Sequence, residues 1–403
     1  MILFQNLKIR SILLSTLAVT ACCGFLISGC SVSKDTALVM SGDTNAAAMA
    51  EFISNPNDSR LKDRKFEQVP AVGATADGKH IFVAWYSGGA APGPGNYVTL
   101  SVSEDKGKTW LNDQLAIYPR STEYRLFDPA IWRDQFGQVH LFYGSAKNNL
   151  IWDGYGGVNA VEIKWNGKKV SNSAPVRISD GVMSNKPVYL DSKNTALFPV
   201  YIDKPLPGTK SETAFPQDGA FIYSRDYSKS GRKLILSAYS SIRIPEELRI
   251  HDEPQVVELN ETGEHLALVR TTKGIYSTHS SDFGKSWSEV QPFTASGPTT
   301  SSRFYIGKLS SGNLLLVSNN STTRNKMTAF LSMDGGKSWP HKLLLDAREN
   351  VSYPDADQTS DGSIHVVFDR ERTGAKDILY CRFTENDLIK GDGNAVFKTR
   401  VNK

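Results

Sequence analysis

The sequence predicts an all-β protein built as one six-bladed β-propeller. Two repeated patterns predict this fold: a tight turn followed by a short apolar strand recurs six times, and a turn signature that ends in Trp follows in several of those units. The composition, with 40% hydrophobic and 22% charged residues over 403 positions, is globular and excludes a disordered or collagen-like chain. Units spaced about 49 to 70 residues apart suit four-stranded blades.

Residues 1–30 carry the features of an export signal. Two basic residues precede an apolar stretch over 12–27, which is shorter than the roughly 20 residues of a membrane span. The segment ends in the letters LISGC, which resemble a bacterial lipoprotein cleavage box. That resemblance implies a lipid anchor on Cys30 and a place at the bacterial outer membrane or in the periplasm. A plain signal peptide cleaved elsewhere is the alternative.

Residues 31–59 are rich in Ser, Ala, Asn and Asp, which predicts a flexible tether, and residues 391–403 are expected to be a C-terminal tail. The propeller then occupies 60–390. The chain has 46 basic and 42 acidic residues, two of the basic ones in the leader, and this balance argues against nucleic-acid binding. Only Cys30 and Cys381 remain once the leader is removed, so no structural disulfide is expected. We expect a monomer.

Each of the six units begins with a turn that contains Gly or Asn, residues that reach positive φ at low cost. The strand after the turn is continuously apolar, which indicates burial on both faces. Helix is scarce, with one helical turn expected at 245–248. The six predicted strands are 80–85, 139–143, 196–200, 265–269, 314–317 and 364–368.

A second signal follows in four units. The segments 103–110, 280–287 and 332–339 share the form Ser-x-Asp-x-Gly-x-[Thr/Ser]-Trp, and 224–226 is a decayed copy. The Asp carboxylate can accept backbone N–H groups inside the turn, Gly takes the strained position and Trp packs beneath. These segments resemble the Asp boxes of sialidase-type propellers, which implies a six-bladed propeller of the sialidase type. In that family the boxes lie on the blade periphery, so their tryptophans are expected to belong to the core.

Together with the strand repeat, these boxes make nearly the whole mature chain resemble the sialidase (neuraminidase) superfamily. Within it, the chain resembles bacterial sialidase-like proteins that carry Asp-box (BNR) repeats. This resemblance implies a glycoside hydrolase of the exo-α-sialidase type that acts on a glycan. Sialidases hold the substrate carboxylate with three arginines and use a Tyr nucleophile, a Glu partner and an Asp acid/base, an exception among glycosidases. A neutral Tyr avoids the repulsion that a carboxylate nucleophile would meet beside an anionic sugar.

Four positions match the family's site motifs. Glu253 resembles the Glu that accepts the proton of the nucleophile, and Tyr353 resembles the nucleophile itself. Arg270 and Arg324 resemble the second and third arginines, and a guanidinium fork suits a carboxylate better than Lys does. The structural alternatives are ion pairs for the charged groups and a packed hydroxyl for the tyrosine. The charged run 369–372 either supports this site or lies at a solvated edge.

Two positions depart from the family pattern. Gln68 stands where the first arginine is expected, so substrate binding at this position would lack that charge. The stretch 79–103 contains no Asp or Glu, although the family's acid/base Asp lies there. Protonation of the leaving oxygen then needs another group, and the candidates are Asp128, Asp153 and His251.

Three functions stay open on sequence grounds. The first is a hydrolase that removes sialic acid or a related acidic sugar, such as a uronic acid. The second is a polysaccharide lyase on a uronate-containing glycan, with His251 and Tyr353 as proton carriers. The third is a non-catalytic glycan-binding propeller, expected to expose Trp85, Tyr155 and Tyr305 at its mouth. The sequence has no dinucleotide or phosphate-loop glycine fingerprint, metal-type Cys/His spacing or serine-esterase elbow, so no cofactor or metal is expected.

Overall fold

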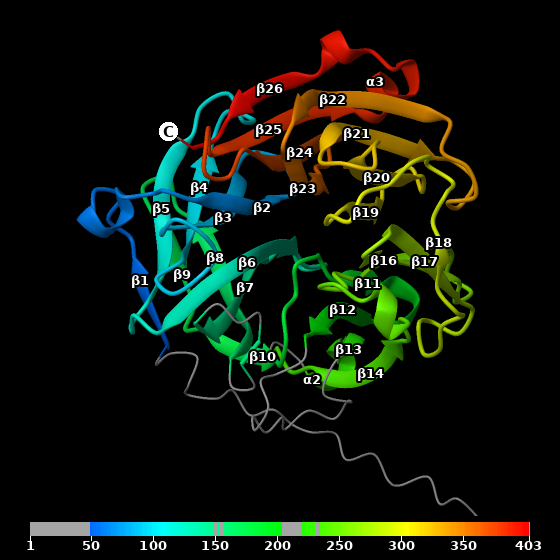
Figure 1. The fold of residues 1–403 in the computed structure, drawn as a ribbon, viewed down its shortest axis with the longest axis horizontal. Coiled ribbons are helices and arrows are strands. Elements are labelled where there is room, and N and C mark those ends of the chain that lie inside the picture. The colour runs from blue at the N-terminus through cyan, green and yellow to red at the C-terminus, as the bar shows by residue number, and fades with distance from the viewer. Residues whose placement is uncertain (1–48, 149–151, 154–155, 204–218, 231–233, 403) are drawn as a thin grey trace, which may run out of the picture. The chain divides into compact units, whose positions relative to one another are not determined.

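The computed structural model describes residues 49–148, 152–153, 156–203, 219–230 and 234–402. Six antiparallel sheets follow one another along the chain and are arranged in a ring around a central axis (Figure 1). Apart from the first strand, the strands of each sheet pair mainly with their neighbours in the chain, so each sheet is a meander that forms one blade. The predicted all-β, six-bladed propeller is confirmed.

The first three blades hold fourteen strands. Blade 1 contains β1 (Ala50–Ile53), β2 (Glu67–Ala74), β3 (Ile81–Ser87), β4 (Tyr97–Ser103) and β5 (Leu111–Pro119). Blade 2 contains β6 (Tyr124–Arg133), β7 (Val139–Lys147), β8 (Gly157–Trp165), β9 (Val170–Asn172) and β10 (Val176–Ser179). Blade 3 contains β11 (Val188–Leu190), β12 (Thr195–Ile202), β13 (Gly219–Asp226) and β14 (Ser237–Ile242).

The last three blades have four strands each. Blade 4 contains β15 (Gln255–Glu258), β16 (His265–Thr271), β17 (Gly274–Ser280) and β18 (Gln291–Pro292). Blade 5 contains β19 (Tyr305–Lys308), β20 (Leu314–Asn319), β21 (Asn325–Ser332) and β22 (His341–Glu349). Blade 6 contains β23 (Val351–Gln358), β24 (Ser363–Arg370), β25 (Asp377–Thr384) and β26 (Phe397–Arg400). The short helical segments are η1 (Ser59–Leu61), η2 (Asp191–Lys193), α2 (Tyr227–Ser230), η3 (Glu246–Leu248), α3 (Glu385–Lys390) and η4 (Gly393–Ala395).

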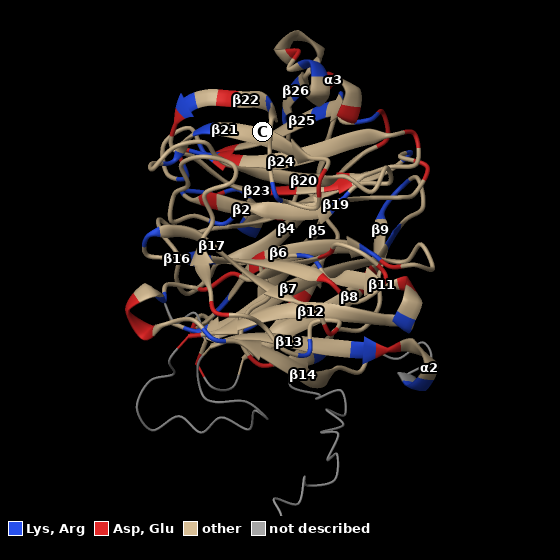
Figure 2. Ribbon diagram, turned by 90° about the vertical axis from the view of Figure 1, so that its right-hand side faces the viewer, with Lys and Arg blue, Asp and Glu red and all other residues tan. Residues whose placement is uncertain are grey.

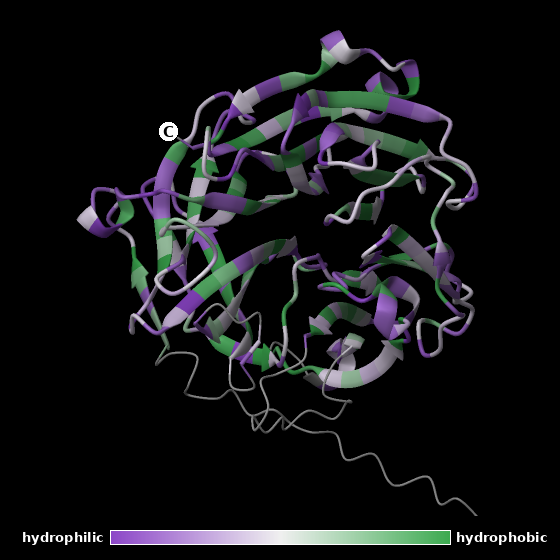
Figure 3. Ribbon diagram, viewed as in Figure 1, coloured by the Kyte–Doolittle hydropathy of each residue, from purple (hydrophilic) through white to green (hydrophobic). Residues whose placement is uncertain are grey.

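The strands predicted from the turn pattern are the second strands of the six blades, counted from the axis outwards. In blade 1 this count begins at β2 and leaves β1 as the outermost strand. β3, β16 and β20 are buried along their whole length, and β7, β12 and β24 along nearly all of it. A strand covered on both faces has no solvated side, which explains why its apolar residues run continuously instead of alternating. Figure 3 shows hydrophobic residues concentrated within the strands and hydrophilic ones in the connecting loops. The helical turn expected at 245–248 is η3.

The Asp boxes join the third strand of a blade to the fourth. In blade 4, Asp282 accepts hydrogen bonds from Ser286 N at 2.9 Å, Ser286 Oγ at 2.6 Å and Ser280 Oγ at 2.8 Å. The boxes that begin at Ser103 and Ser332 make matching bonds. The box tryptophans are buried or half-buried, as expected for core residues: Trp110, Trp287 and Trp339.

Blades 6 and 1 share no strand, and they are joined by side-chain hydrogen bonds together with backbone bonds such as that from Glu67 N to the Arg372 carbonyl. Three carboxylates of blade 6 accept backbone N–H groups of the inner strand β2. A buried N–H group needs a partner, so these carboxylates satisfy one edge of β2 while they close the ring. The three bonds are Val69 N to Asp369 at 3.0 Å, Val72 N to Asp355 at 2.8 Å and Ala74 N to Asp357 at 2.9 Å.

The folded part of the chain extends beyond both boundaries expected from composition, which corrects the limits of 60 and 390. β1 falls within the expected tether and pairs with β5, and β26 falls within the expected tail and pairs with β25. An outer strand leaves a row of backbone groups unpaired, and these two added strands cover that row in blades 1 and 6.

Charged residues lie mainly in loops and at strand ends, and the strand interiors carry few of them (Figure 2). Cys381, in β25, is a free thiol, and its burial raises its pKa to about 12. Within the described residues, no helix has the length and apolar character needed to cross a bilayer. The predicted leader and its Cys30 lie outside the described residues.

Candidate active site

Each blade has one residue at an equivalent position close to the axis, either on its innermost strand or two residues before that strand begins. In every blade, regular pairing with the second strand begins or resumes two residues after this position. In all blades except the fifth, the next residue is Pro. We call these residues the ring positions; in blade order they are Val69, Asp128, Lys186, Glu253, Arg303 and Tyr353.

Four ring positions have left-handed backbone, although none is Gly. The φ angle is 53° at Val69, 44° at Asp128, 39° at Glu253 and 53° at Tyr353. Such a residue typically costs about 1–3 kcal/mol, and backbone strain of this kind gathers at functional sites. The pairing register shifts at three of these positions, in β2, β6 and β23, and such a bulge re-aims a side chain out of the regular pleat.

Tyr353 and Glu253 are joined through one guanidinium. Arg270 Nη1 donates to the Tyr353 hydroxyl at 3.1 Å and to Glu253 Oε2 at 3.1 Å. One nitrogen atom therefore bridges the phenolic oxygen and the carboxylate oxygen. All three side chains are buried. Burial alone would lower the pKa of Arg270, but the Glu253 carboxylate and the Tyr353 hydroxyl raise it above its ordinary value, which keeps the guanidinium charged.

Two further arginines surround the ring of Tyr353. Arg324 Nη2 lies 3.4 Å from the hydroxyl, and its Cζ lies 4.9 Å from the ring centroid. Arg372 Cζ lies 4.3 Å from the same centroid. Burial would lower the pKa of Arg372, but Asp369 and Tyr353 raise it. Guanidinium groups from blades 4, 5 and 6 therefore converge on one tyrosine.

Sequence reasoning did not single out Arg372, which belongs to the charged run expected either to support the site or to lie at a solvated edge. The Arg372 guanidinium donates to Ser352 Oγ at 2.8 Å, and its Nε lies 3.4 Å from Asp369. Its backbone carbonyl accepts a bond from Glu67 N at 3.0 Å, which places it beside Gln68 in blade 1. Gln68 is itself buried, and its Oε1 accepts no hydrogen bond from any described residue. No local sequence signal reveals this contact, because it spans the closure of the ring.

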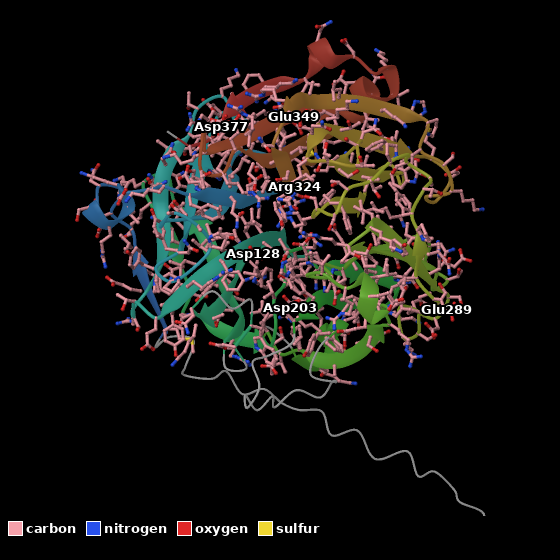
Figure 4. All side chains as sticks on the ribbon, in the orientation of Figure 1. Asp128, Asp203, Glu289, Arg324, Glu349 and Asp377 are labelled. Carbon is pink, nitrogen blue, oxygen red and sulfur yellow. The ribbon has the colours of Figure 1, made fainter. Side chains whose placement is uncertain are left out.

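Asp128 is the remaining ring position with an acidic side chain. The residue is 8% exposed, and its carboxylate has no hydrogen bond or ion pair with any described residue. Burial raises the pKa of Asp128 above its ordinary value, and Glu253 raises it further, whereas Arg125 and Arg303 act in the opposite direction. Figure 4 shows Asp128 and Arg324 close to the middle of the ring.

The other two acid/base candidates have partners of their own. Asp153 accepts backbone bonds from Lys147 N at 2.8 Å and from Gly156 N at 2.6 Å, which ties its carboxylate to its own loop. His251 Nδ1 lies 2.9 Å from Asp203, and this hydrogen bond raises the pKa of His251. Across the described ranges, no group of three or more His, Cys, Asp or Glu side chains could hold a metal ion.

The two cationic ring positions, Lys186 and Arg303, bond to groups of other blades. Arg303 donates to the carbonyls of Ser184 at 2.8 Å, Pro70 at 2.6 Å and Tyr353 at 3.3 Å. Lys186 Nζ bonds to the carbonyl of Ile131 at 2.6 Å and to the Asp355 carboxylate at 2.7 Å, and it also bonds to the carbonyl of Val72. Lys186 and Arg303 therefore tie groups of several blades together around the axis.

The Asp-box propeller and this site can be compared with known families. A family model for the BNR repeat-like domain matches residues 79–366, which is most of the chain. The chain belongs to the BNR repeat-like family. No curated protein sequence matches this BNR repeat-like protein.

Solved structures that resemble this BNR repeat-like protein include sialidases. A Hadza microbial sialidase is 16% identical with a TM-score of 0.61, over 84% of this chain and 69% of that one. The NanB sialidase from Streptococcus pneumoniae is 14% identical with a TM-score of 0.60, over 83% of this chain and 72% of that one. The intramolecular trans-sialidase from Ruminococcus gnavus is 14% identical with a TM-score of 0.54, over 83% of this chain and 98% of that one. At these identities the likeness shows the fold, a propeller of the sialidase type.

Proposed function

We propose that this BNR repeat-like protein is an exported glycoside hydrolase of the sialidase type. It removes an anionic terminal sugar, sialic acid or a related acidic sugar, from a glycan. The observation that carries the proposal is the surroundings of Tyr353, whose hydroxyl is bonded to Arg270 and Arg324 while Glu253 is bonded to the same nitrogen of Arg270. A tyrosine buried only for packing needs one hydrogen-bond partner, not two cations and a linked carboxylate.

In the proposed reaction, Tyr353 is the nucleophile and Glu253 is the base that accepts its proton. The arginines that now bond to the hydroxyl stabilise negative charge as it develops on the phenolic oxygen. A substrate carboxylate would draw the same guanidinium forks, because planar donors bind carboxylates in pairs. Binding and activation of the nucleophile therefore use one set of charges, which explains why the substrate is expected to be an acid.

The two other functions receive less support from the geometry. A lyase would pair His251 with Tyr353, but His251 is bound to Asp203. A binding platform would expose Trp85, yet Trp85 is 0% exposed and donates to Glu67, so that expectation is wrong.

The other two aromatic residues expected on a binding platform do not support it either. Tyr305 is half-buried and lines a separate cavity with Trp132 and Lys308. Tyr155 lies outside the described residues.

The test is release of free sugar from defined substrates. Purified protein is incubated with 3′-sialyllactose, with 4-nitrophenyl α-N-acetylneuraminide and with glucuronate-terminated oligosaccharides. We expect hydrolysis of at least one of them and a loss of about 100-fold or more in Tyr353→Phe and Glu253→Gln. Tyr276→Phe, in the third strand β17 of blade 4, is the control that keeps a tyrosine replacement away from the site.

Two results would contradict the hydrolase. An unsaturated product that absorbs in the ultraviolet would indicate elimination by a lyase. Glycan binding without turnover, unchanged in Tyr353→Phe, would indicate a binding protein.

Export is part of the same proposal and rests on the sequence. The leader ends in a box whose Cys30 would carry the lipid, and the product would be anchored at the outer membrane or facing the periplasm. When the wild type is expressed in a bacterium fed a labelled fatty acid, we expect the protein to carry the label and to lie in the membrane fraction. Cys30→Ala is expected to remain an uncleaved or soluble precursor; labelling of Cys30→Ala equal to that of the wild type would refute the anchor.

A further inference from the structure

Blade 1 lacks both of the groups that the sialidase-type reaction would ask of it. Its inner strand has Gln68 where an arginine is expected, and its ring position is the apolar Val69. No acidic residue occurs in 79–103. The chemistry nevertheless needs a full set of charges for the carboxylate and a proton for the leaving oxygen.

We infer that the two neighbouring blades supply what blade 1 lacks. Arg372, in the loop after β24 of blade 6, is the third arginine for the substrate carboxylate, and Asp128, in β6 of blade 2, is the proton donor. This inference rests on the proposed hydrolase and deepens it, because it fills the role of the missing arginine and chooses one proton donor among the three candidates that the sequence left open.

Arg372 is held in a fixed position next to blade 1. The backbone of Arg372 is bonded to Glu67, so the residue is held beside Gln68. Its guanidinium is held by Ser352 at 2.8 Å and by Asp369 at 3.4 Å, and the same Asp369 accepts the backbone N–H of Val69. Of the four guanidinium groups around Tyr353, that of Arg372 lies closest to the ring centroid. A pre-oriented guanidinium loses little freedom on binding, so it suits a carboxylate subsite.

Asp128 occupies the same strained ring position as Tyr353 and Glu253. Its backbone is left-handed and precedes Pro129, as theirs precede Pro354 and Pro254. Unlike Asp153, its carboxyl group makes no structural bond with any described residue. Asp128 is buried, and a buried polar group without a partner is costly, so its carboxyl group is available to a ligand.

The charges that face Asp128 come from every element packed around it. Burial and the Glu253 carboxylate favour its neutral form, which is the form a proton donor needs. Arg125 and Arg303 limit this rise in the pKa of Asp128, so the carboxyl group can still release its proton. The charged and titratable groups around Asp128 are Arg125 on β6, Glu253 and His251 before β15, Arg303 before β19, Tyr86 on β3 and Tyr201 on β12.

The step balances in atoms and charge. The Tyr353 oxygen forms a bond to the anomeric carbon as the bond from that carbon to the leaving oxygen breaks. The Tyr353 proton moves to Glu253, and the Asp128 proton moves to the leaving oxygen, which departs as an alcohol. Water then attacks the same carbon and gives a proton to Asp128, while Tyr353 departs and recovers its proton from Glu253. The net reaction is hydrolysis of one glycosidic bond.

Substrate binding tests Arg372 without any need for turnover. The dissociation constants of N-acetylneuraminic acid and glucuronic acid are measured by calorimetry for the wild type, Arg372→Lys, Arg372→Met and the control Arg348→Met. Arg348 is an exposed arginine on β22 that is paired with Asp346. We expect binding roughly 10- to 100-fold weaker in Arg372→Met, with partial recovery in Arg372→Lys. Wild-type affinity in a folded Arg372→Met would overturn this role, as would an equal loss in Arg348→Met.

Leaving-group dependence tests Asp128. Asp128→Asn is assayed on 3′-sialyllactose, whose leaving alcohol needs a proton, and on 4-nitrophenyl α-N-acetylneuraminide, whose leaving phenol barely needs one. We expect kcat/KM to fall about 100- to 10,000-fold on the first and tenfold or less on the second. The decline of activity at high pH should also disappear in the variant. Equal losses on both substrates, or no loss on either, would overturn the assignment.

The outcomes separate this inference from the proposed function. If the wild type cleaves no acidic glycoside, the hydrolase and the role of Asp128 both fail, while sugar-acid binding still decides the role of Arg372. If the wild type is active and Asp153→Asn or His251→Gln shows the leaving-group pattern instead, the hydrolase stands and the role of Asp128 fails.

Discussion

At the scale of single residues, the site depends on one backbone device used several times. Asp128, Glu253 and Tyr353 have left-handed φ and precede Pro, and Val69 shares both features with an apolar side chain. The chain thus carries the cost of this conformation in four blades, while three of them bear groups suited to chemistry. Strain that serves to aim side chains is a cost to stability, and the same applies to a carboxyl group buried without a partner.

Removing the charge of Asp128 is therefore expected to stabilise the protein at neutral pH. Because the pKa of Asp128 is raised on folding, its favourable contribution is complete below the ordinary Asp pKa and is lost as the pH rises through the raised value. Asp128→Asn should then have a higher Tm than the wild type at pH 8, and the difference should shrink towards pH 4. Thermal unfolding between pH 4 and pH 8 measures it.

The control for this prediction is Asp63→Asn, an exposed carboxylate whose nearest cation, Lys65, lies at 3.5 Å. It should leave the pH profile of Tm unchanged. A pH-independent drop in Tm in Asp128→Asn would show that the carboxyl group has a structural role and would count against its place in the reaction.

At the scale of elements, each blade combines a buried second strand with a locally closed turn. The Asp box is stabilised within a few residues: Asp282 accepts bonds from Ser280 and Ser286, and Gly284 takes positive φ. Gly284 N in turn donates to Ser280 Oγ at 2.9 Å. Because these bonds are local, the motif can be recognised in the sequence. It does not depend on the candidate site around Tyr353.

Asp282→Ala should destabilise blade 4 without a change in catalysis. The lost bonds to the turn are expected to cost about 1 kcal/mol. Burial would raise the pKa of Asp282, but the bonds from Ser286 and Ser280 outweigh it and lower the pKa to about 2. The stabilisation is therefore present above the ordinary value of 3.8 and is lost as the pH falls towards 2.

Denaturant unfolding of Asp282→Ala and wild type at pH 7 and pH 2.5 measures the prediction, with Asp63→Ala as the exposed control. An unchanged difference between the two proteins at both pH values would mean that the carboxylate bonds do not stabilise the box. A change in kcat would contradict the view that the Asp box does not affect the candidate site around Tyr353.

At the scale of the whole molecule, the axis is held by cations that reach across the ring. Lys186 from blade 3 bonds to the carbonyls of Val72 and Ile131 and to Asp355, and thus joins blades 1, 2, 3 and 6. Arg303 from blade 5 bonds to carbonyls of blades 1, 3 and 6, including that of Tyr353. Closure of the ring and the position of the nucleophile therefore depend on the same buried contacts.

Lys186→Met should be strongly destabilising, by about 3–5 kcal/mol, because it leaves the buried Asp355 carboxylate without its cation. The double variant Lys186→Met with Asp355→Asn should recover part of that loss, since the remaining amide oxygen can still accept the Val72 N–H. Denaturant unfolding at pH 7 measures both, with the exposed Lys168→Met as control. A double variant less stable than Lys186→Met would refute the unpaired charge as the cause.

Part of the site could be predicted from the sequence because its members follow recognisable local patterns. Glu253 and Tyr353 precede Pro near the start of inner strands, and Arg270 lies at the end of an apolar strand. Arg324 comes immediately before the strand β21 that leads to an Asp box. The structure brings these four together as expected. It does not bring together the whole set of acid candidates, because Asp153 is used by its own loop.

The sequence by itself determined the six-bladed fold, the positions of its second strands and the Asp boxes. These depend on burial and on hydrogen bonds within a few residues, so they leave local periodic patterns. Only the tertiary structure decided that the folded part includes β1 and β26 and that Arg372 stands beside Gln68. The bond from Val69 to Asp369 spans 300 positions. Contacts of this kind arise from closure of the ring, and closure brings together side chains whose proximity no local pattern in the chain records.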